Sequence, residues 1–195
     1  MKDATLESSI NDSWPLLPLG QVIEKVSTGF ATGKRDAKGV IQLRMNNVST
    51  LGQFDWSILT RVPESEIGKG QFLEAGDVLF NNTNSTELVG KSALFTGHEE
   101  PVVYSNHFTR LRVKKDKLSP DYLSLWLQMQ WQNRVFANIC NQWIGQSAVQ
   151  PSKLITLQIP IPPLNEQQQI AEGLQKRLKA LEQSRAAAEA QLETL

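Results

Sequence analysis

The segment IPIPPLNEQQQIAEGLQKRLKALE, residues 159–182, decides the fold, because a short apolar strand passes through three prolines into a long helix. Asn165 and Gln168 have the spacing of a capping box at the start of that helix. Farther along, apolar side chains and one arginine recur at alternating spacings of 4 and 3 residues, as in a coiled-coil heptad. This seam consists of Leu174, Leu178, Leu181, Arg185, Ala188, Leu192 and Leu195.

The length of this helix limits how it can be placed. A helix over residues 164–195 would be about 45 Å long at a rise of about 1.5 Å per residue. A domain of ordinary size cannot cover that length, so the helix is expected to project or to pair with a second helix. The alternative is an amphipathic helix that packs on its own domain.

The chain before this helix alternates between short strands and one further helix. Residues 14–26 predict an anchoring turn and a short helix, and residues 119–136 predict a helix with Ser119 as N-cap and buried aromatic side chains. Residues 140–153 are predicted to form a loop. Short apolar runs separated by Gly, Asn, Ser and Thr predict strands at 40–45, 77–80, 93–95, 101–104 and 107–113. The expected fold is α+β, a small curved β-sheet with helices and a long C-terminal coiled-coil helix.

Composition and charge limit the classes of protein to which this chain can belong. The chain has 195 residues, of which 40% are hydrophobic, so it can bury a core. Its single cysteine, Cys140, cannot form an internal disulfide, and the N-terminal residues lack the apolar stretch of a signal peptide or membrane helix. A cytoplasmic location without a membrane span is therefore expected. The net charge is zero, but residues 25–115 carry twelve Lys and Arg against nine acids, whereas residues 1–24 carry one Lys against four acids.

The sequence motifs typical of nucleotide-binding, metal and catalytic sites are incomplete in this chain. GFATGKR at 29–35 and STELVGKS at 85–92 both depart from a phosphate-binding loop, in spacing or in a missing first glycine. Two histidines and one cysteine give no zinc spacing. A nucleophilic pair of Cys140 and His107 is conceivable, but a cysteine after the apolar run VFANI more often packs as a small hydrophobic residue. No cofactor, no metal and no catalysis by this chain alone are expected.

The segment 159–182 resembles the one that closes each target recognition domain in the specificity subunits of type I restriction-modification enzymes. Residues 14–29 are similar to the start of such a domain, residues 73–84 and 89–95 to its central strand and loop, and residues 144–162 to its exit. In order and spacing these segments cover residues 14–195.

The resemblance implies a non-catalytic subunit that binds double-stranded DNA and recruits methyltransferase and restriction subunits. It divides the chain into a flexible N-terminus at 1–13, a target recognition domain at 14–163 and a dimerisation helix at 164–195. A full-length subunit of that family has two recognition domains and two helices packed antiparallel, whereas this chain has one of each. The expected result is a homodimer that pairs through the seam and reads a palindromic split site.

Base recognition requires amides, hydroxyls and arginines on loops, surrounded by cations for the phosphates. The candidate residues lie on three loops and at two strand ends. They are Thr28, Thr32, Lys34, Arg35 and Lys38; Asn81, Asn82, Thr83, Asn84 and Ser85; Trp143, Gln146 and Ser147; and Arg44, Asn46, His107 and Arg110. The alternatives are an Asn-rich turn bonded to its own backbone and a Trp143 that packs against the domain.

Three other functions remain open at this stage. The chain could be a recognition domain from a single-chain restriction-methylation enzyme, or a coiled-coil module that binds only protein. A cryptic nuclease would have to cleave DNA with metal on its own.

Overall fold

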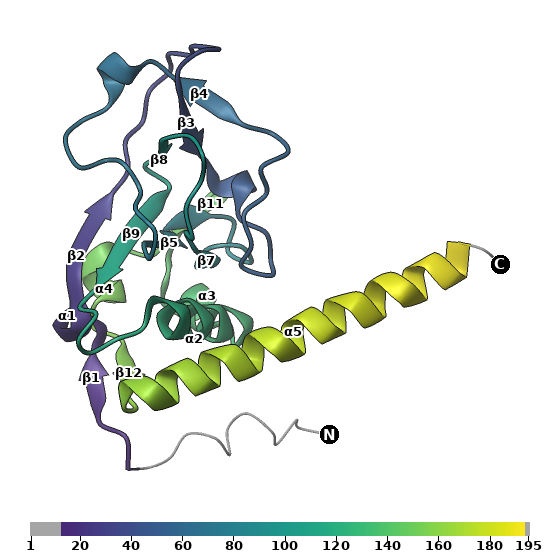
Figure 1. The fold of residues 1–195 in the computed structure, drawn as a ribbon. Helices are drawn as coiled ribbons and strands as arrows, with labels where there is room; N and C mark the ends of the chain where they lie inside the picture. The colour runs from purple at the N-terminus through teal and green to yellow at the C-terminus, as the bar shows by residue number, and fades with distance from the viewer. Residues whose placement is uncertain (1–12, 194–195) are drawn as a thin grey trace.

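The computed structural model describes residues 13–193, so Leu195 of the predicted seam lies outside the described residues (Figure 1). The α+β fold class is confirmed, but the strands form four small sheets rather than a single curved one. The largest sheet is antiparallel and has the order β2 (Ile23–Thr28), β9 (Phe108–Val113), β5 (Val78–Asn81), β7 (Ser92–Leu94). A second sheet places β3 (Val40–Leu43) between antiparallel β4 (Thr60–Val62) and parallel β8 (Val102–Tyr104).

Strand β5 lies between two hydrophobic cores, which is why all four of its residues are buried. Side chains alternate along a strand. Val78 and Phe80 therefore enter one core together with the helices, while Leu79 enters the other core with Ile41 and Tyr104 of the second sheet. The five apolar runs in the sequence become β3, β5, β7, β8 and β9, as predicted.

The two remaining sheets join segments that are far apart in the sequence. β1 (Leu16–Pro18) pairs with β12 (Gln158–Pro160), while β10 (Asn141–Trp143) and β11 (Gln146–Ala148) form a hairpin whose second strand pairs with β6 (Thr83–Asn84). The prediction of a plain loop at 140–153 is thus wrong, because this segment forms the hairpin and the short helix α4 (Pro151–Leu154). The predicted helix near residue 20 is one turn, α1 (Leu19–Val22).

The predicted helix at 119–136 is real but interrupted. α2 (Pro120–Gln132) ends where Arg134 takes a left-handed conformation with φ 58°, and α3 (Val135–Ile139) follows. The aromatic ring of Phe136 still reaches the core, where its centroid lies 4.8 Å from that of Phe80. Two 3₁₀ turns, η2 (Met45–Asn47) and η3 (Glu64–Glu66), complete the domain.

Helix α5 (Leu164–Glu193) crosses α2 with its first half and then extends away from the domain (Figure 1). It begins at Leu164, so Asn165 lies inside the helix and the predicted capping box is wrong. Gln167 fixes the helix start instead. Its buried side chain accepts a hydrogen bond from the amide of Ser119 at 2.8 Å and donates to the carbonyls of Lys117 and Pro162.

Within residues 13–193, none of the helices is both long and apolar enough to span a membrane.

Candidate nucleic-acid interface

Several loops converge where the four-stranded sheet that contains β5 meets the three-stranded sheet that contains β3. The amide of Ser105 donates to the carbonyl of Leu43 at 2.9 Å, and the amide of Asn82 donates to the carbonyl of His107 at 2.9 Å. These bonds bring the ends of β3 and β5 to the turn between β8 and β9, and β6 carries the hairpin to the same place. We call this surface the loop face. It consists of Thr28, Arg44, Met45, Asn46, Thr83, Asn84, Asn106, His107 and residues 142–146 of the hairpin, all at least partly exposed.

Arg44 provides a positive charge on the loop face, and this charge acts on the neighbouring His107. Burial, followed by the positive charge of Arg44, lowers the pKa of His107 from its ordinary value of 6.5. The imidazole is therefore neutral near pH 7 and can both donate and accept a hydrogen bond. Asn46, which is exposed on η2, adds an amide beside Arg44.

The asparagine run divides into buried and exposed members. The amide of Asn81 donates to the carbonyls of Thr83 and His107, and the amide of Asn82 donates to the carbonyl of Asn106 and the hydroxyl of Thr109. Both side chains are buried, but the alternative of a turn bonded to its own backbone holds only for Asn81, because Asn82 bonds to residues of the segment 106–109. Thr83, Asn84 and Ser85 are half-buried and remain at the surface.

Arg110 and Ser147 also lie inside the fold rather than at the surface. The guanidinium of Arg110 is 1% exposed, donates to the carbonyl of Phe72 at 2.8 Å and stacks over the ring of Tyr104. The hydroxyl of Ser147 is hydrogen-bonded to that of Thr86 at 2.7 Å. Asn81, Asn82, Arg110 and Ser147 therefore cannot face a DNA groove in this conformation, contrary to what the loop and strand positions predict.

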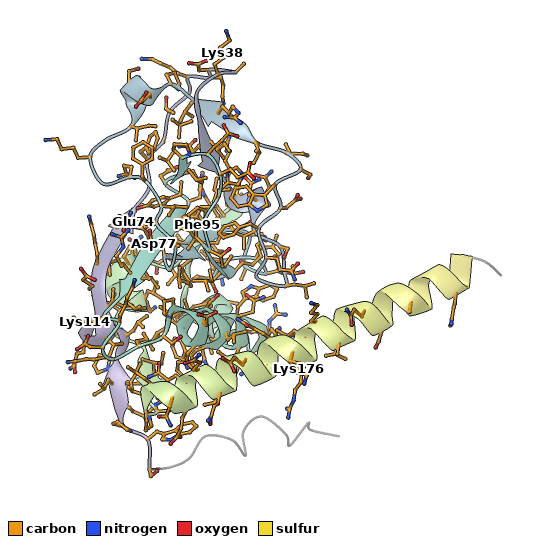
Figure 2. The ribbon with its side chains drawn as sticks, in the orientation of Figure 1. Lys38, Glu74, Asp77, Phe95, Lys114 and Lys176 are labelled. Carbon is orange, nitrogen blue, oxygen red and sulfur yellow. The ribbon has the colours of Figure 1, made fainter. Side chains whose placement is uncertain are left out.

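Hydrogen bonds and an ion pair connect the loop of residues 29–39 to η3. Glu66 accepts hydrogen bonds from the hydroxyl of Thr32 at 3.0 Å and from the ammonium of Lys34 at 2.7 Å. The hydrogen bond to Glu66, followed by the negative charge of its carboxylate, raises the pKa of Lys34, so the ammonium stays protonated in this ion pair. Arg35 donates to the carbonyls of Thr32 and Lys34 in its own loop. Lys38 is exposed at the tip of the domain away from α5 (Figure 2).

A buried lysine holds the segment that carries Arg44 and Asn46. Lys91 is 6% exposed, and its ammonium donates to the carbonyls of Met45 and Val48. Gln128 of α2 donates to the carbonyl of Thr50 in the same segment. Burial lowers the pKa of Lys91. The sequence marked this lysine only as part of a defective phosphate loop, and its role in positioning the loop face was missed.

Five residues of the loop face were absent from the predicted site: Met45, Asn106 and, in the hairpin, Gln142, Ile144 and Gly145. Met45 and Asn106 are both exposed, next to Arg44 and His107 respectively. The polar pair Ser105 and Asn106 between the apolar runs at 101–104 and 107–113 is the signal that could have indicated Asn106. Met45 stands inside a strand-like run and gives no comparable signal.

In the part of the chain that the structure describes, Cys140 and the acidic side chains do not assemble into a metal site. Cys140 is half-buried, and its thiol donates to the carbonyl of Ala137. Among residues 13–193, no cluster of three or more His, Cys, Asp or Glu side chains could hold a metal ion.

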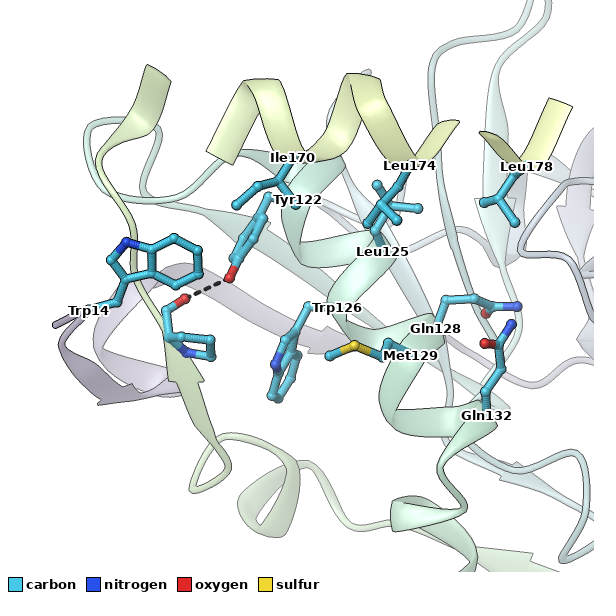
Figure 3. Close-up of a pocket in the computed structure, with 11 residues that line it drawn as sticks. Trp14, Tyr122, Leu125, Trp126, Gln128, Met129, Gln132, Ile170, Leu174 and Leu178 are labelled. Atoms are coloured by element: carbon cyan, nitrogen blue, oxygen red, sulfur yellow. Dashed lines mark hydrogen bonds between the residues drawn. The ribbon is translucent and has the colours of Figure 1, made fainter. Parts of the chain in front are cut away.

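The first half of the predicted seam faces α2 of the same domain. Leu174 and Leu178 are half-buried and line a largely apolar cavity of about 180 Å³ together with Tyr122, Trp126 and other side chains of α2 (Figure 3). Tyr122 closes one side by donating to the carbonyl of Pro160 at 3.0 Å. Leu181, the next residue of the seam after Leu178, is 66% exposed. Side-chain placements at Arg185, Ala188 and Leu192 lie outside what the structure describes.

A rigid β scaffold that presents polar loops at one surface, with a helix extending from the domain, defines a recognition module. The chain belongs to the family of type I restriction modification DNA specificity domains, which it matches over residues 11–193.

Relatives of known name agree with this family. The chain is 31% identical over 169 residues to the MjaX specificity subunit of Methanocaldococcus jannaschii, covering 85% of this chain and 39% of that subunit. It is 29% identical over 199 residues to the type I restriction enzyme EcoKI specificity subunit of Escherichia coli K12, covering 87% of this chain and 39% of that subunit. The chain therefore spans about two fifths of the length of these relatives.

Solved structures support the fold. The HsdS subunit from Thermoanaerobacter tengcongensis superimposes with a TM-score of 0.63 at 17% identity, covering 90% of this chain and 40% of that one. A chain from a study of complex assembly and conformational transition of the type I R-M system superimposes with a TM-score of 0.69 at 19% identity, covering 94% of this chain and 44% of that one. The fold of this chain is thus shared with about two fifths of each of these chains.

Proposed function

We propose that this chain reads double-stranded DNA through the loop face and acts as the sequence-specificity subunit of a type I restriction-modification system. The observation that supports this most strongly is the convergence of Arg44, Asn46, Asn84, Asn106 and His107 on one surface of a rigid scaffold. Amides and a guanidinium are the side chains that recognise base edges in the major groove. Support from buried Lys91 and Gln128 keeps the backbone under these groups in place.

The loop of residues 29–39 supplies the phosphate contacts in this proposal. Lys34, Arg35 and Lys38 add cations beyond the loop face, and Thr32 adds a hydroxyl. The ion pair of Lys34 with Glu66 is exposed, so a phosphate can compete for the lysine. Thr28, Thr83, Ser85, Trp143 and Gln146 complete the candidate contacts, whereas Asn81, Asn82, Arg110 and Ser147 hold the scaffold.

The family supports the choice of partners. In this proposal the subunit recruits a methyltransferase subunit and a restriction subunit, which supply the chemistry, and it acts in the cytoplasm. Two copies pair through the outer part of α5, starting at the exposed Leu181. The inner leucines, Leu174 and Leu178, contribute less to this pairing because α2 already contacts them.

The test is the binding of a labelled duplex of mixed sequence by the full chain with the methyltransferase subunit, measured between 50 and 200 mM salt. Release of counterions predicts that the logarithm of the affinity falls linearly with the logarithm of the salt concentration, by roughly one unit of slope per phosphate contact. An affinity that does not depend on salt, or no binding at the lowest salt concentration, would contradict the proposal.

A further inference from the structure

The tip of the β10–β11 hairpin exposes two large apolar side chains. Ile144 is 106% exposed and Trp143 is 58% exposed, while Trp56 elsewhere in the domain is half-buried and stacks on Phe54 and His98. The expectation that Trp143 packs against the domain is therefore wrong. Among the large hydrophobic residues that the structure describes, Ile144 has the highest fractional exposure.

The hairpin holds this tip rigidly. Trp143 pairs with Gln146 across a turn of two residues, and Gly145 in that turn has φ 75°, a conformation that glycine adopts without strain. The base of the hairpin is tied to the domain through the pairing of Ser147 with Asn84 and the hydroxyl bond from Ser147 to Thr86. A β-carbon at Gly145 would meet no atom within 4 Å, so the tip stands clear of the domain.

The surroundings of the tip match the chemistry of a base pair. Gln146 pairs with Trp143 and places an amide on the same face of the hairpin, and Gln142 adds an exposed amide on the opposite face. The amide of Asn84 on the neighbouring strand donates to Asn81 at 2.6 Å. Bases present polar edges and apolar faces, so a partner that exposes both fits an apolar tip flanked by amides. Isoleucine is among the side chains that DNA-bending proteins insert between base pairs, and indoles stack on bases.

We propose that Ile144 and Trp143 form a wedge that inserts between adjacent base pairs of the bound duplex and unstacks them. This inference rests on the proposed DNA-binding function and adds a distortion of the DNA to it. Gln142 and Gln146 then contact the polar edges of the separated pairs.

The experiment uses duplexes enriched from a random pool by the wild-type chain with its methyltransferase subunit, with 2-aminopurine placed at successive positions. The wild type should raise the 2-aminopurine fluorescence at one step of the site. The double variant Trp143→Ala/Ile144→Ala should lose that signal and bind about tenfold more weakly or worse, as expected for a lost stacking contact. Trp143→Phe should retain most of the signal.

Ile58→Ala is the matched control, because Ile58 is also exposed, at 69%, but lies outside the loop face. It should leave affinity and fluorescence unchanged, and circular dichroism should show that all variants are folded. Full affinity and an unchanged fluorescence signal in the double variant would overturn the wedge while leaving DNA binding intact. Retained DNA binding with loss of methyltransferase capture would overturn it too, because the tip would then contact protein. Absence of DNA binding by the wild type would remove the proposed function and the wedge together.

Discussion

The guanidinium of Arg112 holds the carboxylate of Asp77 by two hydrogen bonds, from Nε to Oδ1 at 2.7 Å and from Nη2 to Oδ2 at 2.9 Å. Asp77 is 1% exposed, and its second cationic neighbour is the equally buried Arg110, with Nη1 3.8 Å from Oδ2. Asp77 therefore balances the positive charges of two guanidinium groups of β9. Because Asp77 immediately precedes β5, these contacts also connect β5 to β9.

Asp77→Ala should reduce the free energy of unfolding by about 3 kcal/mol or more, because it leaves Arg110 buried without a counterion. Urea denaturation measures this loss. Glu100→Ala is the control, since the exposed carboxylate of Glu100 accepts a similar paired contact from Arg61, and a smaller loss is expected. Equal losses in the two variants would show that burial of the pair does not determine its contribution.

Local patterns in the sequence predict much of this fold. Alternating apolar runs located five strands, and the Ser-Pro start located α2, because both depend on neighbours within a few residues. The break at Arg134 carries no such signal, since a left-handed arginine is set by its surroundings. The hairpin at 141–148 was missed because its second strand is completed by pairing with β6, more than 60 residues earlier.

The candidate site was harder to predict for the same reason. Whether an amide is exposed depends on partners distant in the chain, as Asn82 shows by bonding to Thr109 across 27 residues. Arg110 and Arg112 both stand on β9, and no local pattern shows that the side chain of Arg110 is the one fully buried. The sequence indicates which segments carry amides, but not which of those side chains are buried in the folded domain.

Substitutions on the loop face should separate recognition from folding. Asn46→Ala should weaken binding to an enriched duplex by about 1 to 3 kcal/mol with little change in stability, because Asn46 is exposed. Asn82→Ala should lower the midpoint of urea unfolding, because it leaves the carbonyl of Asn106 and the hydroxyl of Thr109 without this donor. Fluorescence anisotropy and urea unfolding of both variants test this, and a reversed pattern would contradict the assignment of these two residues.

His107 should make stability depend on pH. Its pKa in the folded protein lies below its ordinary value of 6.5, so the unfolded chain binds a proton first as the pH falls. The free energy of unfolding of the wild type should thus decrease relative to His107→Gln as the pH falls through 6.5, with no such change at higher pH. Urea denaturation at pH 8, 7, 6 and 5.5 measures the difference, and a constant difference would refute the effect.

Charge at the outer seam should separate a dimer without unfolding the domain. Leu181→Lys places an ammonium at an exposed seam position, where pairing would bury it, so the mass in light scattering should fall to that of a monomer. Ala180→Lys adds the same charge at an exposed neighbouring position outside the seam and should leave the mass unchanged. If both variants keep the wild-type mass, helix α5 does not pair through the seam.

Selection of sequences from a random pool of duplex DNA by the full chain with its methyltransferase subunit tests the central claim most directly. The account predicts enrichment of one two-part sequence with inverted half-sites at a fixed spacing, and loss of that enrichment in Arg44→Ala/Asn46→Ala. A selected pool with the same composition as the starting pool would contradict sequence-specific recognition by the loop face.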